Sequence, residues 1–440
     1  MKKYKKERLR TFAEEYSNMY PDTEKKIKEI TFQVTEDCCL KCTYCYQTNK
    51  SRNKMTFDVA KKFIDALLND EYDIATIKNT AGIGVEFIGG EPLMEVDLIT
   101  NIIEYLLSRM IELDHPWLYY TRFSIPSNGV LVESDKVIEF FDKYNTVCHL
   151  GISIDGNKAL HDSCRIDFNN NGSYDRAISA VHFYKNRYGI MPSTKMTLAP
   201  QNVHYTKDAV LNLINEGYED IALNCAFEKG WELDHARILY DQLKELADYI
   251  IENDLYDRVY ISMFEENLFC PIGEDENDNW CGGVKDKMLA IDYKGDMHPC
   301  IRYMDSSLNG KQPPIIIGNI DRGYIASESD RLNIEKITNI TRRSQSTDEC
   351  YYCHIAKGCA WCSAHNYQET GSVNCRLTYI CIMHKARALA NVYYWNKLYQ
   401  YLGIDKKFIN YVDNRDIDSI IIPKEDNDNG KQFIQFFKIN

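Results

Sequence analysis

Three closely spaced cysteines carry the strongest chemical signal in this chain. Cys38, Cys42 and Cys45 stand at C-x3-C-x2-C spacing, directly after an apolar segment that is predicted to be a strand. Three thiolates in one short loop can hold three irons of a [4Fe–4S] cluster, and the fourth iron then has an open coordination site that can bind and cleave a small molecule. The alternative is a zinc knuckle, but structural zinc normally takes four protein ligands, with paired C-x2-C halves.

The elements that must position this loop alternate between strand-like and helical patterns. Helical periodicity fills the gaps between the strand-like segments, for example over residues 57–68 and 97–113. Such alternation predicts an α/β fold with a parallel sheet. The cysteine loop and three further polar or glycine-rich segments each follow a predicted strand, so they are expected to meet at one rim of the sheet. The strands are predicted at residues 30–34, 85–88, 122–126, 146–153, 195–198 and 221–224.

Together with Gly89-Gly90-Glu91-Pro92 one strand later, the cysteine loop resembles the radical S-adenosylmethionine (SAM) superfamily. The resemblance implies a partial (β/α)6 TIM-type barrel, with SAM bound at the open iron and cleaved to a 5′-deoxyadenosyl radical. It also implies a set of SAM-binding residues, with Arg165 on the carboxylate and a surface ion pair as the alternative for that residue. Gln33, Asp155 and Asn224 are interpreted as substrate contacts or as structural polar groups inside the barrel. The implied SAM-binding residues are Tyr44, Gly89, Gly90, Glu91, Ser153 and Arg165.

A second cysteine array begins after residue 269 and resembles the SPASM domain of radical SAM peptide-modifying enzymes, an irregular module with two auxiliary [4Fe–4S] clusters. The resemblance assigns Cys281, Cys300 and Cys362 to the first auxiliary cluster, with Cys270 as the fourth ligand. It assigns Cys350, Cys353, Cys359 and Cys381 to the second, with Cys375 as the alternative to Cys381. The protein would then hold three [4Fe–4S] clusters. A zinc ribbon of Cys350, Cys353, Cys359 and Cys362 is the competing interpretation.

Composition restricts the other functional classes. The net charge of −13 argues against binding nucleic acid. The chain has no apolar run long enough to cross a membrane and no signal peptide, so a cytoplasmic location is expected. The 16 cysteines then indicate metal or cluster ligation, since disulfides do not persist in a reducing compartment.

The chain is divided into five predicted segments. They are an N-terminal helical extension (1–28), the barrel (29–240), a helical linker (241–269), the auxiliary-cluster domain (270–385) and a C-terminal helix and tail (386–440). Within the tail, Ile420–Ile422 is expected to pair as an edge strand that Pro423 ends.

These features favour a peptide maturase that abstracts a hydrogen from a ribosomally made precursor peptide and forms an intrapeptide cross-link, most simply a cysteine thioether. Many related maturases carry a fused winged-helix domain that binds the leader peptide. Only about 29 residues precede the first predicted strand here, which are too few to form such a domain. Leader recognition would therefore need a separate leader-binding protein or the barrel surface itself. An electron donor such as flavodoxin or ferredoxin is also expected. The alternatives are an anaerobic sulfatase-maturating enzyme, which carries an acid where this chain has Ile301, an enzyme that forms C–C cross-links, and a non-enzymatic electron carrier.

Overall fold

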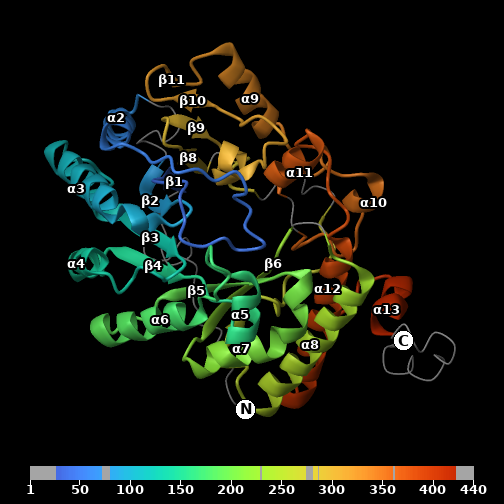
Figure 1. Cartoon of the computed structure of the whole chain (residues 1–440). Helices are drawn as coiled ribbons and strands as arrows, with labels where there is room; N and C mark the ends of the chain where they lie inside the picture. The colour runs from blue at the N-terminus through green and yellow to red at the C-terminus, as the bar shows by residue number, and fades with distance from the viewer. Residues whose placement is uncertain are drawn as a thin grey trace.

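A curved sheet of parallel strands forms the frame of the molecule (Figure 1). The computed structural model describes residues 26–71, 80–227, 230–273, 281–285, 287–359 and 362–422. Strands β1 to β7 lie side by side in chain order, and each pairs in parallel with the next. They are β1 (Lys26–Gln33), β2 (Thr80–Ile88), β3 (Thr121–Ser127), β4 (Cys148–Ile152), β5 (Ser193–Leu198), β6 (Asp220–Cys225) and β7 (Tyr260–Ile261).

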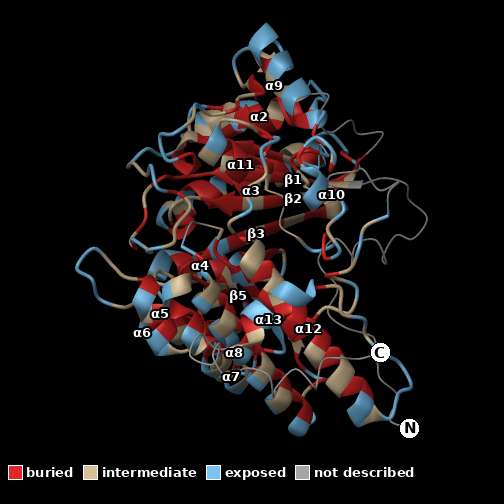
Figure 2. Ribbon diagram, turned by 90° about the vertical axis from the view of Figure 1, so that its right-hand side faces the viewer, coloured by how far each residue is buried: buried red, intermediate tan, exposed pale blue. Residues whose placement is uncertain are grey.

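Alternation along the strands separates a helix-facing side from a concave side. Phe32, Phe87 and Phe123 stack across β1, β2 and β3 at centroid distances of 5.9 and 6.2 Å, and Phe32 meets Phe63 of α2 edge-on. Buried residues concentrate on the central strands and on the helices around them (Figure 2). The alternate positions, such as Gln33 of β1, therefore face the concave side, because successive side chains of a strand point to opposite faces.

The α-helices follow the strands and cover the outer side of the sheet in its first half (Figure 1). The last long helix, α12, packs closely along α8. The helices are α2 (Phe57–Leu68), α3 (Val96–Glu112), α4 (Asp135–Tyr144), α5 (Lys158–Cys164), α6 (Tyr174–Tyr188), α7 (Thr206–Asn215), α8 (Leu233–Glu252), α9 (Glu328–Thr338), α10 (Asp348–Tyr351), α11 (Ser363–Thr370), α12 (Cys381–Leu402) and α13 (Asn414–Ile421). No helix in the described part of the chain is long and apolar enough to span a membrane.

The cysteine-rich region extends the same sheet. Strand β8 (Met288–Ile291) pairs in parallel with β1, and the antiparallel strands β9 (Asp296–His298), β10 (Gly318–Asn319) and β11 (Gly323–Tyr324) continue outward from it. The result is one 11-stranded sheet with β1 in its interior. The region that was expected to be an irregular module is therefore built onto the edge of the barrel.

The six predicted strands and the alternation with helices are confirmed, and helices and strands cross several of the expected segment boundaries. Residues 1–25 of the expected N-terminal helix lie outside the described residues, and 26–28 belong to β1. The expected linker (241–269) holds the second half of α8 and β7, and α12 begins at Cys381, four residues before the expected domain end at 385.

The expected edge strand at Ile420–Ile422 is also wrong. Ile420 and Ile421 end α13, where Ile417 and Ile420 are buried on one face. The Asp413 side chain caps this helix by accepting from the Arg415 backbone amide (2.8 Å).

Candidate functional site

The three-cysteine loop lies on the concave side of the sheet, fixed by backbone hydrogen bonds. It follows β1, and its amides donate to the carbonyls of Cys164 (2.9 Å) and Ile166 (2.8 Å), where α5 ends. Cys38 is buried, whereas Cys42 and Cys45 are half-buried. The loop is therefore held from two sides, by the strand before it and by the segment after α5.

The three thiols of this loop influence one another, so they face a common space. Burial raises the pKa of Cys42 to about 11, and the charges of Cys45 and Cys38 add to the rise. A hydrogen bond from Cys39 lowers the pKa of Cys38 to about 6, which favours the thiolate that binds iron. Burial alone would lower the pKa of Lys50, but the neighbouring thiolates of Cys45 and Cys38 raise it. Lys50 was not among the residues predicted from the sequence.

Gly89 and Gly90 allow the backbone at the end of β2 to approach the cysteine loop closely. The Gly90 amide donates to the Thr35 carbonyl (3.1 Å). A Cβ on Gly89 would lie 2.7 Å from the Thr35 carbonyl oxygen, and one on Gly90 would lie 2.2 Å from that of Asp37. These glycines therefore have a structural reason to lack side chains in addition to the SAM contact that the sequence implies.

We expect Gly90→Ala to displace the cysteine loop, because the new methyl group would collide with the backbone of Asp37. The variant should lose most of the roughly four irons that the loop is predicted to hold, as measured by iron content after anaerobic reconstitution. Gly189→Ala is the control for a general loss of stability: at φ +69° the alanine strains the end of α6, but its Cβ would meet nothing within 4 Å and would not displace the cysteine loop. Full iron content in Gly90→Ala would show that the loop tolerates the displacement.

Glu91 joins the ends of β2 and β3 below the cysteine loop. Its buried carboxylate accepts from the Ser127 hydroxyl (2.8 Å) and from the backbone amides of Asn128 (2.8 Å) and Leu93 (3.1 Å). Burial raises the pKa of Glu91 to about 7, although the three hydrogen-bond donors lower it. The carboxylate is thus directed at neighbouring loops, and Glu91 acts as a positioning group in this structure. Ser153 lies on the same rim, with its amide bonded to the Ser127 carbonyl (2.9 Å).

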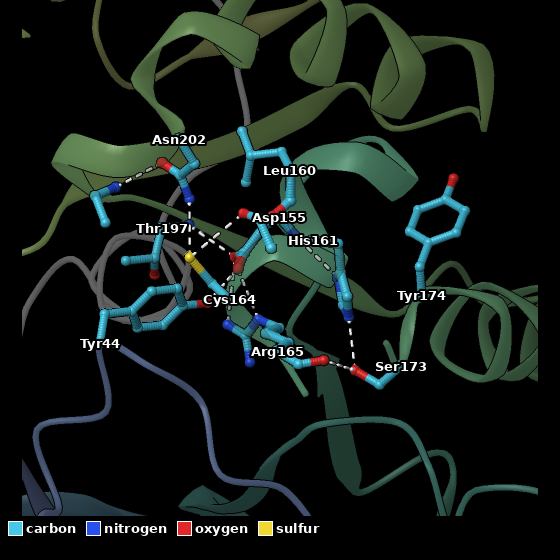
Figure 3. Close-up of polar contacts among 12 residues, drawn as sticks. Tyr44, Asp155, Leu160, His161, Cys164, Arg165, Ser173, Tyr174, Thr197 and Asn202 are labelled. Carbon is cyan, nitrogen blue, oxygen red and sulfur yellow. Dashed lines mark hydrogen bonds and ion pairs between the residues drawn. The ribbon is translucent and has the colours of Figure 1, made fainter. Parts of the chain in front are cut away.

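A buried ion pair connects the cysteine loop to the middle of the barrel (Figure 3). Asp155 accepts from Nε (2.9 Å) and Nη2 (3.3 Å) of Arg165 and from the Thr197 amide (2.9 Å). The Tyr44 hydroxyl donates to the same carboxylate, and the guanidinium lies 5.4 Å from the centre of the Tyr44 ring. Both Tyr44 and Arg165, predicted as SAM ligands, therefore contact a residue that was assigned to the barrel interior.

A neutral histidine, His161, is hydrogen-bonded to the backbone of Asp155 and, through Ser173, to that of Arg165. The Asp155 amide donates to Nδ1 of His161 (3.3 Å), and Nε2 of His161 faces the Ser173 hydroxyl (2.9 Å). Ser173 in turn donates to the Arg165 carbonyl (2.8 Å). Burial lowers the pKa of His161 to about 4, so the ring is neutral and serves to orient its neighbours.

The first auxiliary set of cysteines meets beside a buried tyrosine. Burial raises the pKa of Cys300, and the nearby Cys281 and Cys362 raise it further. Tyr303, which donates to the Ser363 hydroxyl (2.8 Å), lies close to all three thiols. The structure therefore brings together three of the four residues predicted for this cluster.

Cys270, the fourth residue predicted for that set, is held beside the loop of the other set. Its carbonyl accepts from the Lys357 amide (3.1 Å), and its thiol lies 3.8 Å from the Asn267 carbonyl oxygen. The role of Cys270 as a ligand is thus still a prediction.

The second auxiliary set surrounds an arginine. The thiolates of Cys359, Cys350, Cys381 and Cys353 all lie close enough to Arg376 to raise its pKa, against a larger lowering by burial. Cys375 is exposed. The competing zinc ribbon needs Cys362, which lies with the first set instead. Within the described ranges, no three side chains of the kinds that bind metal converge on the position of a single ion.

Direct contacts join the radical-SAM-like loop to the first auxiliary set. The Arg302 guanidinium lies 4.6 Å from the centre of the Tyr46 ring. Tyr46 directly follows Cys45, and Arg302 lies two residues after Cys300. The Asn49 amide donates to the Ser306 carbonyl (3.2 Å). The contact was not predicted, because nothing in the sequence positions of Tyr46 and Arg302 indicates that they meet.

The concave face between these loops carries charged and polar side chains. Gln33 donates to the Ser306 hydroxyl (2.9 Å), and Asn224 is exposed. Burial raises the pKa of Glu86 on β2 and lowers that of Lys195 on β5, and each group offsets the other's shift.

Sequence comparisons agree with this geometry. Residues 32–210 match the radical SAM superfamily. An uncharacterized protein of Methanocaldococcus jannaschii is 28% identical over 274 residues, which cover 62% of this chain and 85% of that protein. A cysteine-type anaerobic sulfatase-maturating enzyme of Clostridium novyi is 27% identical over 179 residues, covering 38% of this chain and 43% of that enzyme. The antilisterial bacteriocin subtilosin biosynthesis protein AlbA of Bacillus subtilis is 21% identical over 277 residues, covering 61% of this chain and 54% of that protein.

The fold is also that of a solved structure, native anSMEcpe with bound AdoMet and Cp18Cys peptide. The two share 17% sequence identity at a TM-score of 0.57, over 86% of this chain and 99% of that one. Residues 32–210 thus form a radical SAM domain, and the protein is an enzyme. It spans only about half the length of two of the curated relatives named above.

Proposed function

We propose that this enzyme is a peptide maturase that forms an intrapeptide cross-link, a thioether between a cysteine sulfur and a carbon of the same peptide. The observation that carries the proposal is the contact of Arg302 with Tyr46, which sets the loop of Cys38, Cys42 and Cys45 next to the first auxiliary set. Hydrogen abstraction and removal of an electron can then occur on neighbouring walls of one barrel.

Three [4Fe–4S] clusters are part of the proposal, with the ligand sets predicted from the sequence. The donor sets fit, because each contains three or four thiols that lie near one another and are at least partly buried. When bound, the loop cluster and SAM supply the 5′-deoxyadenosyl radical that removes a hydrogen atom from the peptide. The chain's own residues hold the loop, exclude water and place charges around the peptide.

The electron balance explains why auxiliary clusters are useful in this reaction. Forming a C–S bond from C–H and S–H removes two hydrogens from the peptide. One leaves as a hydrogen atom to the deoxyadenosyl radical, and the other leaves as a proton and an electron. The electron goes to the auxiliary clusters and then to an external acceptor of the flavodoxin or ferredoxin class. We propose a cytoplasmic location and a separate leader-binding protein for the same enzyme.

Sulfatase maturation is the second candidate, favoured by the similarity to the Clostridium novyi enzyme. Ile301, which follows Cys300 directly, argues against it, because an aliphatic side chain cannot accept a proton at that position. A C–C cross-link is a further alternative, which the mass of the product alone does not separate from a thioether.

Co-expression with the peptide encoded by a neighbouring short open reading frame tests the proposal. We expect the peptide to lose two hydrogens by mass spectrometry and to lose one alkylatable cysteine thiol. Loss of two hydrogens with every cysteine still alkylatable would indicate a C–C cross-link instead. Conversion of a cysteine to formylglycine in a sulfatase-derived peptide would establish the second candidate.

Cys353→Ala tests the role of the second auxiliary set. We expect the variant to cleave SAM at close to the wild-type rate but to make much less cross-linked peptide, because hydrogen abstraction occurs at the barrel rim and the electron leaves elsewhere. The measurement is the ratio of cross-linked peptide to 5′-deoxyadenosine. Cys375→Ala, at an exposed thiol, is the matched control. An unchanged ratio in folded Cys353→Ala protein would contradict the proposed electron route.

A further inference from the structure

A small cavity lies beside Cys362 of the first auxiliary set, which consists of Cys281, Cys300 and Cys362. The cavity has room for no more than about one water molecule, which is too little for a side chain of a peptide. It is lined by Phe227, Cys362, His365, Asn366, Leu377 and Ile380. Whatever fills it is therefore a water molecule or an atom of a group bound to Cys362.

The side chain of Asn366 is fixed in this cavity and only half satisfied. Asn366 is 4% exposed, and its Oδ1 accepts from the Leu377 backbone amide (3.2 Å). This bond sets the orientation of the side-chain amide, because the opposite orientation would place two N–H groups against each other. The Nδ2 atom is buried and has no hydrogen-bond partner among the described residues. A buried N–H group needs an acceptor, and the proposed mechanism gives Asn366 no other role.

Helix α11 places Asn366 on the same side as Cys362. The helix begins directly after Cys362, and the Asn366 backbone amide donates to the Cys362 carbonyl (3.0 Å). Residues four apart lie on one face of a helix. A cluster bound to Cys362 would therefore present its sulfur atoms to the Nδ2 group of Asn366.

Other polar groups at the cavity already have partners. The Phe227 carbonyl accepts from the Tyr379 hydroxyl (2.7 Å) and faces Nε2 of His365 (3.0 Å). Nδ1 of His365 faces the side-chain oxygen of Gln368 (3.3 Å). These contacts leave sulfur as the acceptor that a bound cluster would bring to Asn366.

Contacts outside the cavity hold the first auxiliary set together. The Tyr303 hydroxyl donates to the Ser363 hydroxyl (2.8 Å), which joins the segments that follow Cys300 and Cys362. A Cβ on Gly283, two residues after the third cysteine of the set, would lie 3.5 Å from the Cβ of Cys300. The three cysteines are thus gathered by packing and hydrogen bonds of the residues beside them.

We infer that Asn366 donates a hydrogen bond to a sulfur of the first auxiliary cluster and thereby raises the reduction potential of that cluster. The inference rests on the ligand set proposed above. Reduction adds negative charge to the cluster, and a hydrogen bond to its sulfur stabilises the reduced form more than the oxidised form. Asn366 is a positioning residue in this sense and does not touch the substrate.

The test is paramagnetic resonance of the reduced full-length chain in which the three loop cysteines are replaced by alanine, so that only auxiliary clusters contribute. The first cluster is the signal that disappears on adding Cys300→Ala. With asparagine labelled by 15N at its side-chain amide, we expect a 15N coupling to the first cluster that Asn366→Leu removes. Asn396→Leu is the control, because both ends of that amide bond the Phe408 backbone (2.9 and 2.8 Å).

We also expect Asn366→Leu to lower the ratio of reduced to oxidised first cluster about threefold at fixed potential, equivalent to about 28 mV for a one-electron couple. Asn366→Asp retains the acceptor for the Leu377 amide but loses the N–H groups, so it should shift the ratio in the same direction. Asn396→Leu should stay near the parent value. An unchanged ratio in Asn366→Leu with full iron content overturns the effect on potential, and if that variant loses iron, Asn366→Asp decides by the same criterion.

The parent chain provides a test that needs no substitution at Asn366. The absence of any 15N coupling to its first cluster overturns the inference, because the cavity then holds a water molecule instead. A coupling that persists in Asn366→Leu belongs to another asparagine and overturns it as well. Zinc, or an iron content near four, in the parent overturns the ligand assignment and the inference with it. No peptide takes part in these measurements, so a failure of the proposed cross-linking reaction does not alter their outcome.

Discussion

Replacing Cys38, Cys42 and Cys45 together by alanine is expected to remove about four of roughly twelve irons per chain and to abolish SAM cleavage. The three thiols are the protein ligands proposed for the loop cluster, and Cys38 and Cys45 lie near enough to Cys42 to raise its pKa. Without them, SAM has neither an iron to bind nor a source of the electron. The measurements are iron content and 5′-deoxyadenosine formed under reducing, anaerobic conditions.

Cys148→Ala is the control for this triple variant. Cys148 is a buried thiol on the helix-facing side of β4, and burial raises its pKa. It should keep full iron content and SAM cleavage. Deoxyadenosine formation at the wild-type rate by the triple variant would refute the assignment of the loop.

Asp155→Ala is expected to destabilise the chain by about 3–5 kcal/mol, the usual cost of leaving one partner of a buried ion pair uncompensated. Arg165 would lose both hydrogen bonds to the carboxylate, and the Tyr44 hydroxyl and the Thr197 amide would lose their acceptor. The measurement is the free energy of unfolding from urea denaturation of the cluster-free chain, so that iron loss does not enter the comparison.

The same chain offers a matched control on its surface. Asp142 pairs with Arg187 through two hydrogen bonds of 2.8 and 2.7 Å, but both side chains are more than 40% exposed. Asp142→Ala should therefore cost far less stability than Asp155→Ala, because solvent screens an exposed pair. Equal costs at Asp142 and Asp155 would contradict the structural role of the buried pair. Adding Arg165→Met to Asp155→Ala should recover part of the loss, because the uncompensated charge is removed.

Hydrophobic periodicity predicted the first half of the fold well. The six barrel strands are apolar segments of five to nine residues, long enough for alternation to be visible. The strands that were missed, such as β7 (Tyr260–Ile261) and β10 (Gly318–Asn319), have two residues each. Segments that short form strands only because a neighbouring strand supplies hydrogen-bond partners, which the sequence does not show.

The same limit applies to the candidate site. The spacing of Cys38, Cys42 and Cys45 is local and could be interpreted from the sequence. The partner of Arg165 could not, because an arginine carries no local sign of whether it will meet a ligand or the carboxylate of Asp155 ten residues earlier. The contact between Tyr46 and Arg302 joins segments more than 250 residues apart in the sequence, so only the folded chain reveals it.

The pairing of β8 with β1 also bears on whether the two halves can exist apart. In the complete chain β1 is an interior strand, with β2 on one side and β8 on the other. A barrel without the cysteine-rich half would expose the backbone groups of β1 as a free edge, a template for aggregation. Evolutionary exchange of the auxiliary half for a different module would therefore require a replacement that brings its own strand to cover β1.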